Sequence, residues 1–219
     1  MLDLLTERQR STLVRTGVRR RFKRGEVVFH EGDPGDAAHF VTDGAFIARG
    51  SSTMGEVIAV NIFGVGDVFG EMALLTPGAR RSATVFSHGR GATLMVGRTG
   101  FETLMDAEGH VNRVLLSLTV ERNRTLTALL VELLFAPVEQ RVCNRLLDFA
   151  RIVSPKAVED WVQLSQEDLA TLAGTTRASV NRVLGRARDL GLVELARGRI
   201  RVVDEAALLR RATGGALRG

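Results

Sequence analysis

The chain has 219 residues, of which 45% are hydrophobic and 25% are charged, and its formal net charge is +5. This composition supports globular domains with buried cores and excludes an intrinsically disordered chain. No run approaches the roughly 18 consecutive apolar residues of a membrane-spanning helix, so we expect no membrane protein.

The N-terminal segment 1–16 has charged residues among its leucines. It therefore lacks the apolar centre of a secretory signal, and we expect a cytoplasmic protein. Within this segment, the apolar stretch from Leu4 to Val14 predicts one short helix that packs on the outside of the following domain.

Short runs of β-branched and alternating residues fill the chain from Arg21 to about Arg98. Each run is closed by glycine or by Asp-Gly, and this punctuation recurs about every ten residues. Such spacing is typical of an antiparallel sandwich or barrel of short strands. We predict a β-roll and assign residues 1–100 to a first domain.

The apolar period changes to about 3.6 residues between about Gly100 and Phe135. We predict one long helix and assign it residues 101–136. It carries more leucines than a small domain alone buries, so we expect it to pair with the helix of a second copy, with Leu118 and Leu129 in the seam. A helix packed fully within its own chain is the alternative. Pro137 ends the helix and marks a hinge.

Residues 137–219 form the third predicted domain, which begins with a helix over Val138 to Val153, a loop at 154–160 and a short strand at 162–164. Two short helices follow. Ser165 caps the first, which Gly174 ends, and Thr176 caps the second, which runs to about Leu190. Alternating apolar positions at 192–203 predict a two-stranded hairpin, and the Gly-rich segment 213–219 predicts a frayed tail.

Cys143 is the only cysteine of the chain. It cannot form an internal disulfide, and it cannot supply the several thiolates of an iron–sulfur cluster or a structural zinc site. The histidines show no ligand motif; they are His30, His39, His88 and His110. We therefore expect no bound metal, no catalytic residues and no resident cofactor.

Two neighbouring segments combine groups that suit a phosphate. The first, Phe69-Gly70-Glu71, offers a glycine turn with exposed backbone N–H groups and a carboxylate that accepts from a hydroxyl. The second, Arg81-Ser82-Ala83, offers the forked cationic donor of an arginine and the neutral hydroxyl donor of a serine. On chemistry alone an alternative stays open, namely a surface turn followed by an arginine that is paired with Glu71.

With this spacing the region resembles the cyclic-nucleotide-binding domain and its phosphate-binding cassette. The resemblance implies that Gly70 and Glu71 meet the ribose and that Arg81 and Ser82 meet the cyclic phosphate, and it adds Met72 to the ligand-binding residues.

The purine side of the pocket is expected on the long helix. Members of that family that respond to cyclic AMP usually place adjacent Thr and Ser hydroxyls there, to reach the adenine amine. Thr127 matches the second hydroxyl, whereas Leu126 falls where the first is expected. Arg122 is a further candidate for the pocket, with a solvated or interhelical charge as the alternative.

Segment 165–184 has the pattern of a helix-turn-helix: a short helix, a Gly turn and a capped second helix. The chain from Pro137 onward has 14 basic and 10 acidic residues, so the positive excess that favours a polyanionic partner lies here. With the hairpin that follows, this region resembles the winged helix-turn-helix of bacterial regulators. The predicted DNA-binding residues are Thr176, Arg177, Ser179, Asn181 and Arg182.

In this order the two motifs resemble the CRP/FNR superfamily, and within it the cyclic AMP receptor branch, over nearly the whole chain. The resemblance implies an α+β protein with an N-terminal antiparallel β-roll, a long dimerisation helix and a C-terminal winged helix-turn-helix. It also implies a homodimeric transcription regulator that is not an enzyme and that cyclic AMP controls allosterically. The expected partners are double-stranded DNA with a palindromic operator, a cyclic nucleotide, a second copy of the chain and RNA polymerase.

Two other hypotheses remain. In the first, the DNA-binding dimer is kept but the cassette is vestigial, so that the protein acts without a cyclic nucleotide or with another small effector; Leu126 is its best support. In the second, the protein is an enzyme with a cupin-like barrel and a metal. That hypothesis needs clustered His and carboxylate ligands, and the sequence has no His-x-His pair.

Overall fold

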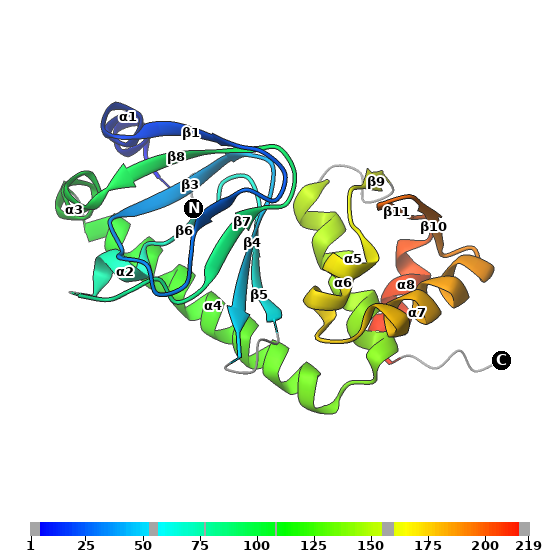
Figure 1. The fold of residues 1–219 in the computed structure, drawn as a ribbon. Helices are drawn as coiled ribbons and strands as arrows, with labels where there is room; N and C mark the ends of the chain where they lie inside the picture. Colours follow the sequence, from blue (N-terminus) through cyan, green and yellow to red (C-terminus); the bar gives the residue numbers. More distant parts are fainter. Residues whose placement is uncertain (1–4, 53–56, 77, 108, 155–159, 215–219) are drawn as a thin grey trace. The chain divides into compact units, whose positions relative to one another are not determined.

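The computed structural model of the protein describes residues 5–52, 57–76, 78–107, 109–154 and 160–214 (Figure 1). The chain forms two compact units. The N-terminal unit comprises Met1–Ser51 and Asn61–Leu126, and the C-terminal unit comprises Ser52–Val60 and Thr127–Gly219. Each unit is described by itself.

The first helix, α1 (Glu7–Thr16), begins at a capping box. The Thr6 hydroxyl accepts from the Gln9 backbone N–H, and the Gln9 side chain accepts from the Thr6 N–H at 2.8 Å. Gln9 and Leu13 are its buried residues. The short helix expected near this position is thus present, shifted by two or three residues.

Two four-stranded sheets follow, in the orders β1-β8-β3-β6 and β2-β7-β4-β5, with antiparallel pairing at every register that the structure describes (Figure 1). This arrangement confirms the predicted antiparallel β-roll. The strands are β1 (Val18–Phe22), β2 (Val27–Phe29), β3 (Ala37–Asp43), β4 (Phe46–Ser51), β5 (Val57–Phe63), β6 (Val68–Phe69), β7 (Thr84–Ser87) and β8 (Gly91–Gly97).

Strand β3 is buried on both of its faces, since every residue from Ala37 to Val41 is buried. On one face, the His39 ring stacks on Phe69 with centroids 5.2 Å apart and planes 4° apart, and its Nδ1 lies 3.0 Å from the Thr93 hydroxyl. Burial first, and Arg81 second, lower the pKa of His39 from 6.5 to about 4. His39 is therefore neutral near pH 7.

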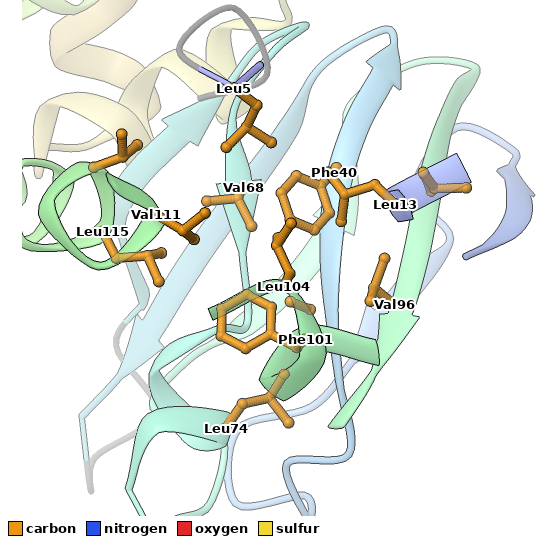
Figure 2. Close-up of a cluster of buried hydrophobic side chains, with 13 residues drawn as sticks. Leu5, Leu13, Phe40, Val68, Leu74, Val96, Phe101, Leu104, Val111 and Leu115 are labelled. Carbon is orange, nitrogen blue, oxygen red and sulfur yellow. The ribbon is translucent and has the colours of Figure 1, made fainter. Parts of the chain in front are cut away.

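On the other face of β3, Phe40 packs in a cluster with helical residues (Figure 2). Phe101 and Leu104 come from α3 (Arg98–Ala107), and Val111 and Leu115 come from α4 (Gly109–Phe135). Figure 2 shows these side chains around Phe40, with Leu13 of α1 beside them. The cluster anchors the helices of the N-terminal unit on the outer face of the sheet.

The single helix expected over 101–136 is two helices in the structure, α3 and α4, with residue 108 between them outside the described residues. Helix α4 still has 27 residues, and the boundary between the two compact units falls inside it.

The two expected seam residues of the long helix are partly or largely buried within their own chain. Leu118 packs against the buried cluster of the N-terminal unit, and Leu129 is only 8% exposed within its own chain. Other apolar side chains of α4 are the exposed ones, and four of them follow one stripe along the helix: Leu116, Val120, Leu130 and Leu134.

The C-terminal unit contains four further helices and a three-stranded sheet in the order β10-β11-β9 (Figure 1). Its expected helices, strand and hairpin are all present. The elements are α5 (Val138–Val153), β9 (Trp161–Val162), α6 (Gln166–Ala173), α7 (Arg177–Asp189), β10 (Val193–Ala196), β11 (Arg199–Val202) and α8 (Glu205–Ala212).

The predicted caps of α6 and α7 and the predicted end of α6 are confirmed. The Ser165 hydroxyl accepts from the Asp168 N–H at 3.0 Å, and the Thr176 hydroxyl accepts from the Ser179 N–H at 3.2 Å. Gly174 ends α6 in the left-handed region, with φ 55° and ψ 50°. Helix α8 was not predicted, although the Asp204 carboxylate caps it.

Cys143 lies on α5 and is buried, with 2% of its surface exposed. Burial raises the pKa of its thiol from 9.0 to about 11. Over the described parts of the chain, every helix is too short or too polar to cross a membrane. Residues 155–159 of the expected loop and 215–219 of the expected tail lie outside the described residues.

Candidate functional site

The predicted cassette begins where β6 ends, at a glycine that the local geometry requires. Gly70 has a φ of 80°, a conformation that side-chain-bearing residues rarely adopt. A Cβ at this position would lie 2.5 Å from Nη1 of Arg81 and 3.2 Å from the carbonyl oxygen of Ala37. The bare backbone at Gly70 therefore allows the Arg81 guanidinium to lie against it.

Arg81 is 4% exposed and is held by three acceptors. Nη1 donates to the Gly70 carbonyl at 2.7 Å, and Nη2 donates to the Ala37 carbonyl at 2.8 Å and to the Asp36 carboxylate at 3.1 Å. The guanidinium carbon lies 4.1 Å from the centre of the Phe29 ring. Burial lowers the pKa of Arg81, and the Asp36 carboxylate opposes this shift.

The open alternative, a surface turn with an arginine paired to Glu71, is wrong for Arg81. Arg81 is buried and pairs with Asp36, whereas Glu71, also 4% exposed, pairs with Arg122 of α4. Arg122 donates to Oε1 of Glu71 and to the Val68 carbonyl, and its guanidinium lies 5.4 Å from the Phe63 ring centre. The alternative for Arg122, a solvated or interhelical charge, is contradicted by the same contacts.

Two buried polar atoms of the cassette have no hydrogen-bond partner in the structure, Nε of Arg81 and Oε2 of Glu71. One is a cationic donor and the other an anionic acceptor. An unpaired buried polar group costs about 1 to 3 kcal/mol, so such atoms are uncommon in folded proteins. Both belong to residues that line one cavity.

This cavity has a volume of about 60 Å³. It is smaller than the roughly 300 to 1,000 Å³ of typical ligand pockets. Ser82 and Met72 are exposed at the cavity, and Met72 is the first residue of the short helix α2 (Met72–Leu75). The polar and charged residues in its lining are Glu71, Arg81, Ser82 and Arg122, and the aromatic ones are Phe29, Phe63 and Phe69.

The structure thus brings together six of the seven predicted ligand-binding residues, namely Gly70, Glu71, Met72, Arg81, Ser82 and Arg122. The seventh, Thr127, is exposed on α4 and is not among the described residues that line the cavity. Leu126 beside it is 49% exposed.

The predicted DNA-binding residues lie at and near the N-terminus of α7. Arg177, Asn181 and Arg182 are exposed there, and Asn181 accepts from Gln166 of α6 at 3.0 Å. The hydroxyls of Thr176 and Ser179 lie 3.1 Å apart, so both take part in the helix cap. The exposed arginines present a cationic surface at a helix N-terminus, where the helix dipole adds to their charge.

A groove of about 570 Å³ borders this helix. Arg177 lines it from α7, Ser165 and Gln166 from the start of α6, and Arg197 and Arg199 from the hairpin β10–β11. Arg199 lies 4.9 Å from the Trp161 ring centre. Sequence reasoning missed these two arginines as site residues, although the Arg-Gly-Arg turn between two predicted strands could have indicated them.

Within the described ranges, the structure has no group of three or more His, Cys, Asp or Glu side chains that could hold a metal ion. His39, the most buried of the histidines whose burial the structure describes, contacts phenylalanine rings and a threonine hydroxyl instead.

Comparison with known proteins gives two family matches. Residues 19–108 match the family described as "Cyclic nucleotide-binding domain". Residues 140–211 match the family described as "Crp-like helix-turn-helix domain". The first match contains every lining residue of the cavity except Arg122, and the second contains α6, α7 and the hairpin.

Individual relatives cover most of the chain. The "Cyclic AMP receptor protein" of Thermus thermophilus is 32% identical over 191 residues, which are 87% of this chain and 86% of that protein. The "Global nitrogen regulator" of Synechococcus elongatus is 26% identical over 195 residues, 85% of this chain and 86% of that protein. The solved structure of FixK2 from Bradyrhizobium japonicum, at 21% identity, has a similar fold, with a TM-score of 0.77 over 89% of this chain and 96% of that one.

Proposed function

The chain belongs to the CRP/FNR family of transcription regulators, and on this premise we propose that it is a homodimer that binds palindromic DNA under the control of a cyclic nucleotide, cyclic AMP. The family consists of DNA-binding regulators, so the chain is not a metal-dependent enzyme with a cupin-like barrel.

The unpaired buried atoms of the cassette carry this proposal. Nε of Arg81 and Oε2 of Glu71 are without partners and belong to residues that line the same cavity, and a cyclic nucleotide would supply the complement of both. A phosphate oxygen accepts from the guanidinium, and a ribose hydroxyl donates to the carboxylate. Binding would thereby remove two costs that the ligand-free protein bears.

The cavity must enlarge to admit a nucleotide, since its volume is about 60 Å³. Arg122 is the side chain whose movement would open it, because it lies between Glu71 and the Val68 carbonyl on the α4 side. Ligand binding and the position of α4 are then linked, and the nucleotide favours the conformation in which the cavity is open.

The exposed stripe on α4 supports the homodimer. The stripe consists of Leu116, Val120, Leu130 and Leu134. Their separations of four, ten and four residues keep them on one side of the helix, as in the seam between two paired helices. A second copy would cover these four exposed apolar side chains, which form two pairs on one side of the helix with Asn123 and Thr127 between the pairs.

Each copy would place one α7 in the major groove of one half-site. Two such helices read half-sites about one helical turn apart, which requires a palindromic operator. RNA polymerase stays an expected partner of the DNA-bound dimer, and we place the protein in the cytoplasm because its DNA target is there.

Calorimetric titration tests this function. Cyclic AMP and, separately, cyclic GMP are added to the protein with and without a duplex selected from random sequences. We expect saturable binding of one nucleotide per chain, tighter for cyclic AMP, and a change of nucleotide affinity when DNA is present. An absence of heat with both nucleotides, together with nucleotide-independent DNA binding, would contradict the proposal.

That negative result is the one expected from the second candidate, a regulator with a vestigial cassette. Leu126, which occupies the place of an expected adenine-binding hydroxyl, favours this candidate. Leu126→Thr separates the two cases. In a cyclic AMP-binding protein this substitution tightens cyclic AMP binding more than cyclic GMP binding, whereas in a protein with a vestigial cassette it changes neither.

A further inference from the structure

The position of α2 is set by contacts from outside the helix. It has four residues, and the backbone bonds that define its turn run from Leu74 N–H and Leu75 N–H to the Glu71 carbonyl, at 2.9 and 3.0 Å. A single turn is not stable by itself, because nucleation of a helix is unfavourable. Whatever holds α2 also holds Glu71, its N-cap residue.

Arg98, the first residue of α3, makes such contacts. Its Nη1 donates to the Leu74 carbonyl at 2.9 Å, and its Nη2 donates to the Ala73 carbonyl at 3.3 Å. These carbonyls belong to the last residues of a helix that has no further turn to bind them.

The same guanidinium reaches a second segment, which runs from Gly35 to Ala37. Nη2 of Arg98 donates to the Gly35 carbonyl at 3.1 Å, and the Arg98 backbone N–H donates to the Asp36 carbonyl at 3.1 Å. A Cβ on Gly35 would lie 2.2 Å from the Cβ of Ala73, so the close approach of the segment to α2 leaves no room for a side chain at Gly35.

Segment 35–37 also binds Arg81, through the Asp36 carboxylate and the Ala37 carbonyl. One arginine, Arg81, therefore lies on the cavity side of this segment, and another, Arg98, ties the segment to α2. The cavity itself is lined by Arg81 and Glu71, and Arg98 is not among its described lining residues.

We propose that Arg98 is a positioning residue of the ligand site: it fixes α2, and with it Glu71, against the segment that holds Arg81. This inference rests on the proposed cyclic-nucleotide function. Arg98 acts through backbone carbonyls and touches no ligand atom. It sets the distance between the group that meets the ribose and the group that meets the phosphate.

The test compares Arg98→Ala and Arg98→Lys with a matched control, Glu102→Gln. Glu102 lies 4.0 Å from Nη1 of Arg98, and both side chains are partly exposed, so Glu102→Gln removes a weak ion pair but keeps every carbonyl contact. Cyclic AMP affinity is measured by calorimetry, and hydrogen exchange of the Leu74 and Leu75 amides is measured without ligand.

We expect Arg98→Ala to weaken cyclic AMP binding at least tenfold and to speed exchange of the two amides, while amides of the β3–β8 pair keep their protection. Arg98→Lys should recover part of the affinity, because an ammonium group can donate to one or two of the carbonyls but lacks the planar fork. Glu102→Gln should bind within twofold of the wild type.

Unchanged affinity and unchanged exchange in Arg98→Ala, in a protein whose wild type binds cyclic AMP, would overturn the positioning role. An equal loss of affinity in Arg98→Lys and Arg98→Ala, with exchange raised throughout the N-terminal unit, would also overturn it, because Arg98 would then act only on general stability. A wild type that binds no nucleotide would reject the proposed function instead, and exchange at Leu74 would still report whether Arg98 holds α2.

Discussion

Arg81 is bound to the protein through two carbonyls and a carboxylate, and this changes what its removal is expected to do. If Arg81 only met the cyclic phosphate, as the resemblance implies, Arg81→Ala would remove a phosphate contact and nothing else. In the structure the same substitution also removes the Arg81 donors from the Gly70 and Ala37 carbonyls, and a buried carbonyl left unpaired costs about 1 to 3 kcal/mol. Arg81→Ala would therefore lower the free energy of unfolding as well as the affinity for cyclic AMP, so weaker binding alone could not be assigned to the lost phosphate contact.

Asp36→Asn is a cleaner probe of the phosphate site, because the Asp36 side chain is 88% exposed. Its carboxylate competes with an anionic ligand for Arg81 and repels it. We expect Asp36→Asn to tighten cyclic AMP binding by up to about fivefold, since exposed ion pairs contribute about 1 kcal/mol or less. Calorimetry checks this, with Asp43→Asn as a control of equal charge change; equal tightening in both variants would indicate a general charge effect.

His39 gives the N-terminal unit a dependence on pH. Its pKa is lowered from 6.5 to about 4 in the folded protein, so the unfolded chain takes up the proton first as the pH falls. The resulting stability is present above pH 6.5 and is lost between pH 6.5 and about 4, by about 3 kcal/mol in all.

Urea unfolding at several pH values tests the role of His39. The difference in unfolding free energy between the wild type and His39→Phe should change across this range, since phenylalanine keeps the stacking on Phe69 but cannot titrate. A constant difference from pH 7 to pH 4.5 would mean that His39 does not cause the acid sensitivity.

At the scale of elements, α4 presents two neighbouring leucines with opposite environments. Leu129 is 8% exposed and Leu130 is 57% exposed. We expect Leu130→Glu to raise the dissociation constant of the dimer at least tenfold, because each dimer would lose two buried leucines of about 1.5 to 3 kcal/mol each. Leu129→Ala should instead lower the free energy of unfolding by about 2 to 5 kcal/mol.

Sedimentation equilibrium measures the first effect and urea unfolding the second. A wild type that is monomeric at all accessible concentrations, with and without DNA, would contradict the seam on α4.

Helix α7 and the hairpin β10–β11 should make different kinds of DNA contact. We expect Arg177→Ala to lose about 1 to 3 kcal/mol of DNA binding at particular guanines, because an arginine fork matches the O6 and N7 acceptors of that base. Arg199→Ala, on the hairpin, should weaken binding to all sequences about equally and reduce the salt dependence of log K by about 1.

Selection from random duplexes, followed by titration at several salt concentrations, separates these contacts. Ala178, which is exposed on α7, cannot accept a hydrogen bond from cytosine. A strong cytosine requirement that Ala178→Glu leaves unaltered would show that residue 178 of α7 does not face that base pair.

The elements that the sequence predicted well are those whose signals are local. The ends of α6 and the start of α7 are set by contacts three or four residues away, made by Ser165, Gly174 and Thr176. Each of these residues was recognised by its type. The sequence predicted one helix over 101–136, whereas the structure has α3 and α4 on either side of residue 108, because the apolar period runs through both helices without a change.

The sequence predicted which residues make up the candidate site, but it did not predict which of their side chains pair with each other. Arg81 bonds to Asp36, 45 residues away, and Arg122 bonds to Glu71, 51 residues away. Nothing local in the sequence selects these partners, because they depend on how the sheets and α4 come together. Arg98 was missed for the same reason, since its acceptors are backbone carbonyls, which carry no sequence signal.

For the whole molecule, the proposed regulation is a coupling between two sites. If cyclic AMP raises the operator affinity by some factor, DNA must raise the cyclic AMP affinity by the same factor, which is typically about 5 to 150 in allosteric proteins. Calorimetry with and without DNA gives one factor, and fluorescence anisotropy of labelled DNA with and without nucleotide gives the other. Operator affinity that is independent of nucleotide would contradict the coupling.

The burial of Cys143 makes the native chain a convenient background for spectroscopic labels. The thiolate is the reactive form of cysteine, and a pKa of about 11 together with 2% exposure keeps this thiol protonated and covered at neutral pH. A maleimide dye will therefore attach only to cysteines introduced at exposed positions, such as Ser11→Cys on α1 and Leu209→Cys on α8. Energy transfer between two such dyes can follow the distance between the two units in solution, without any change to the natural cysteine.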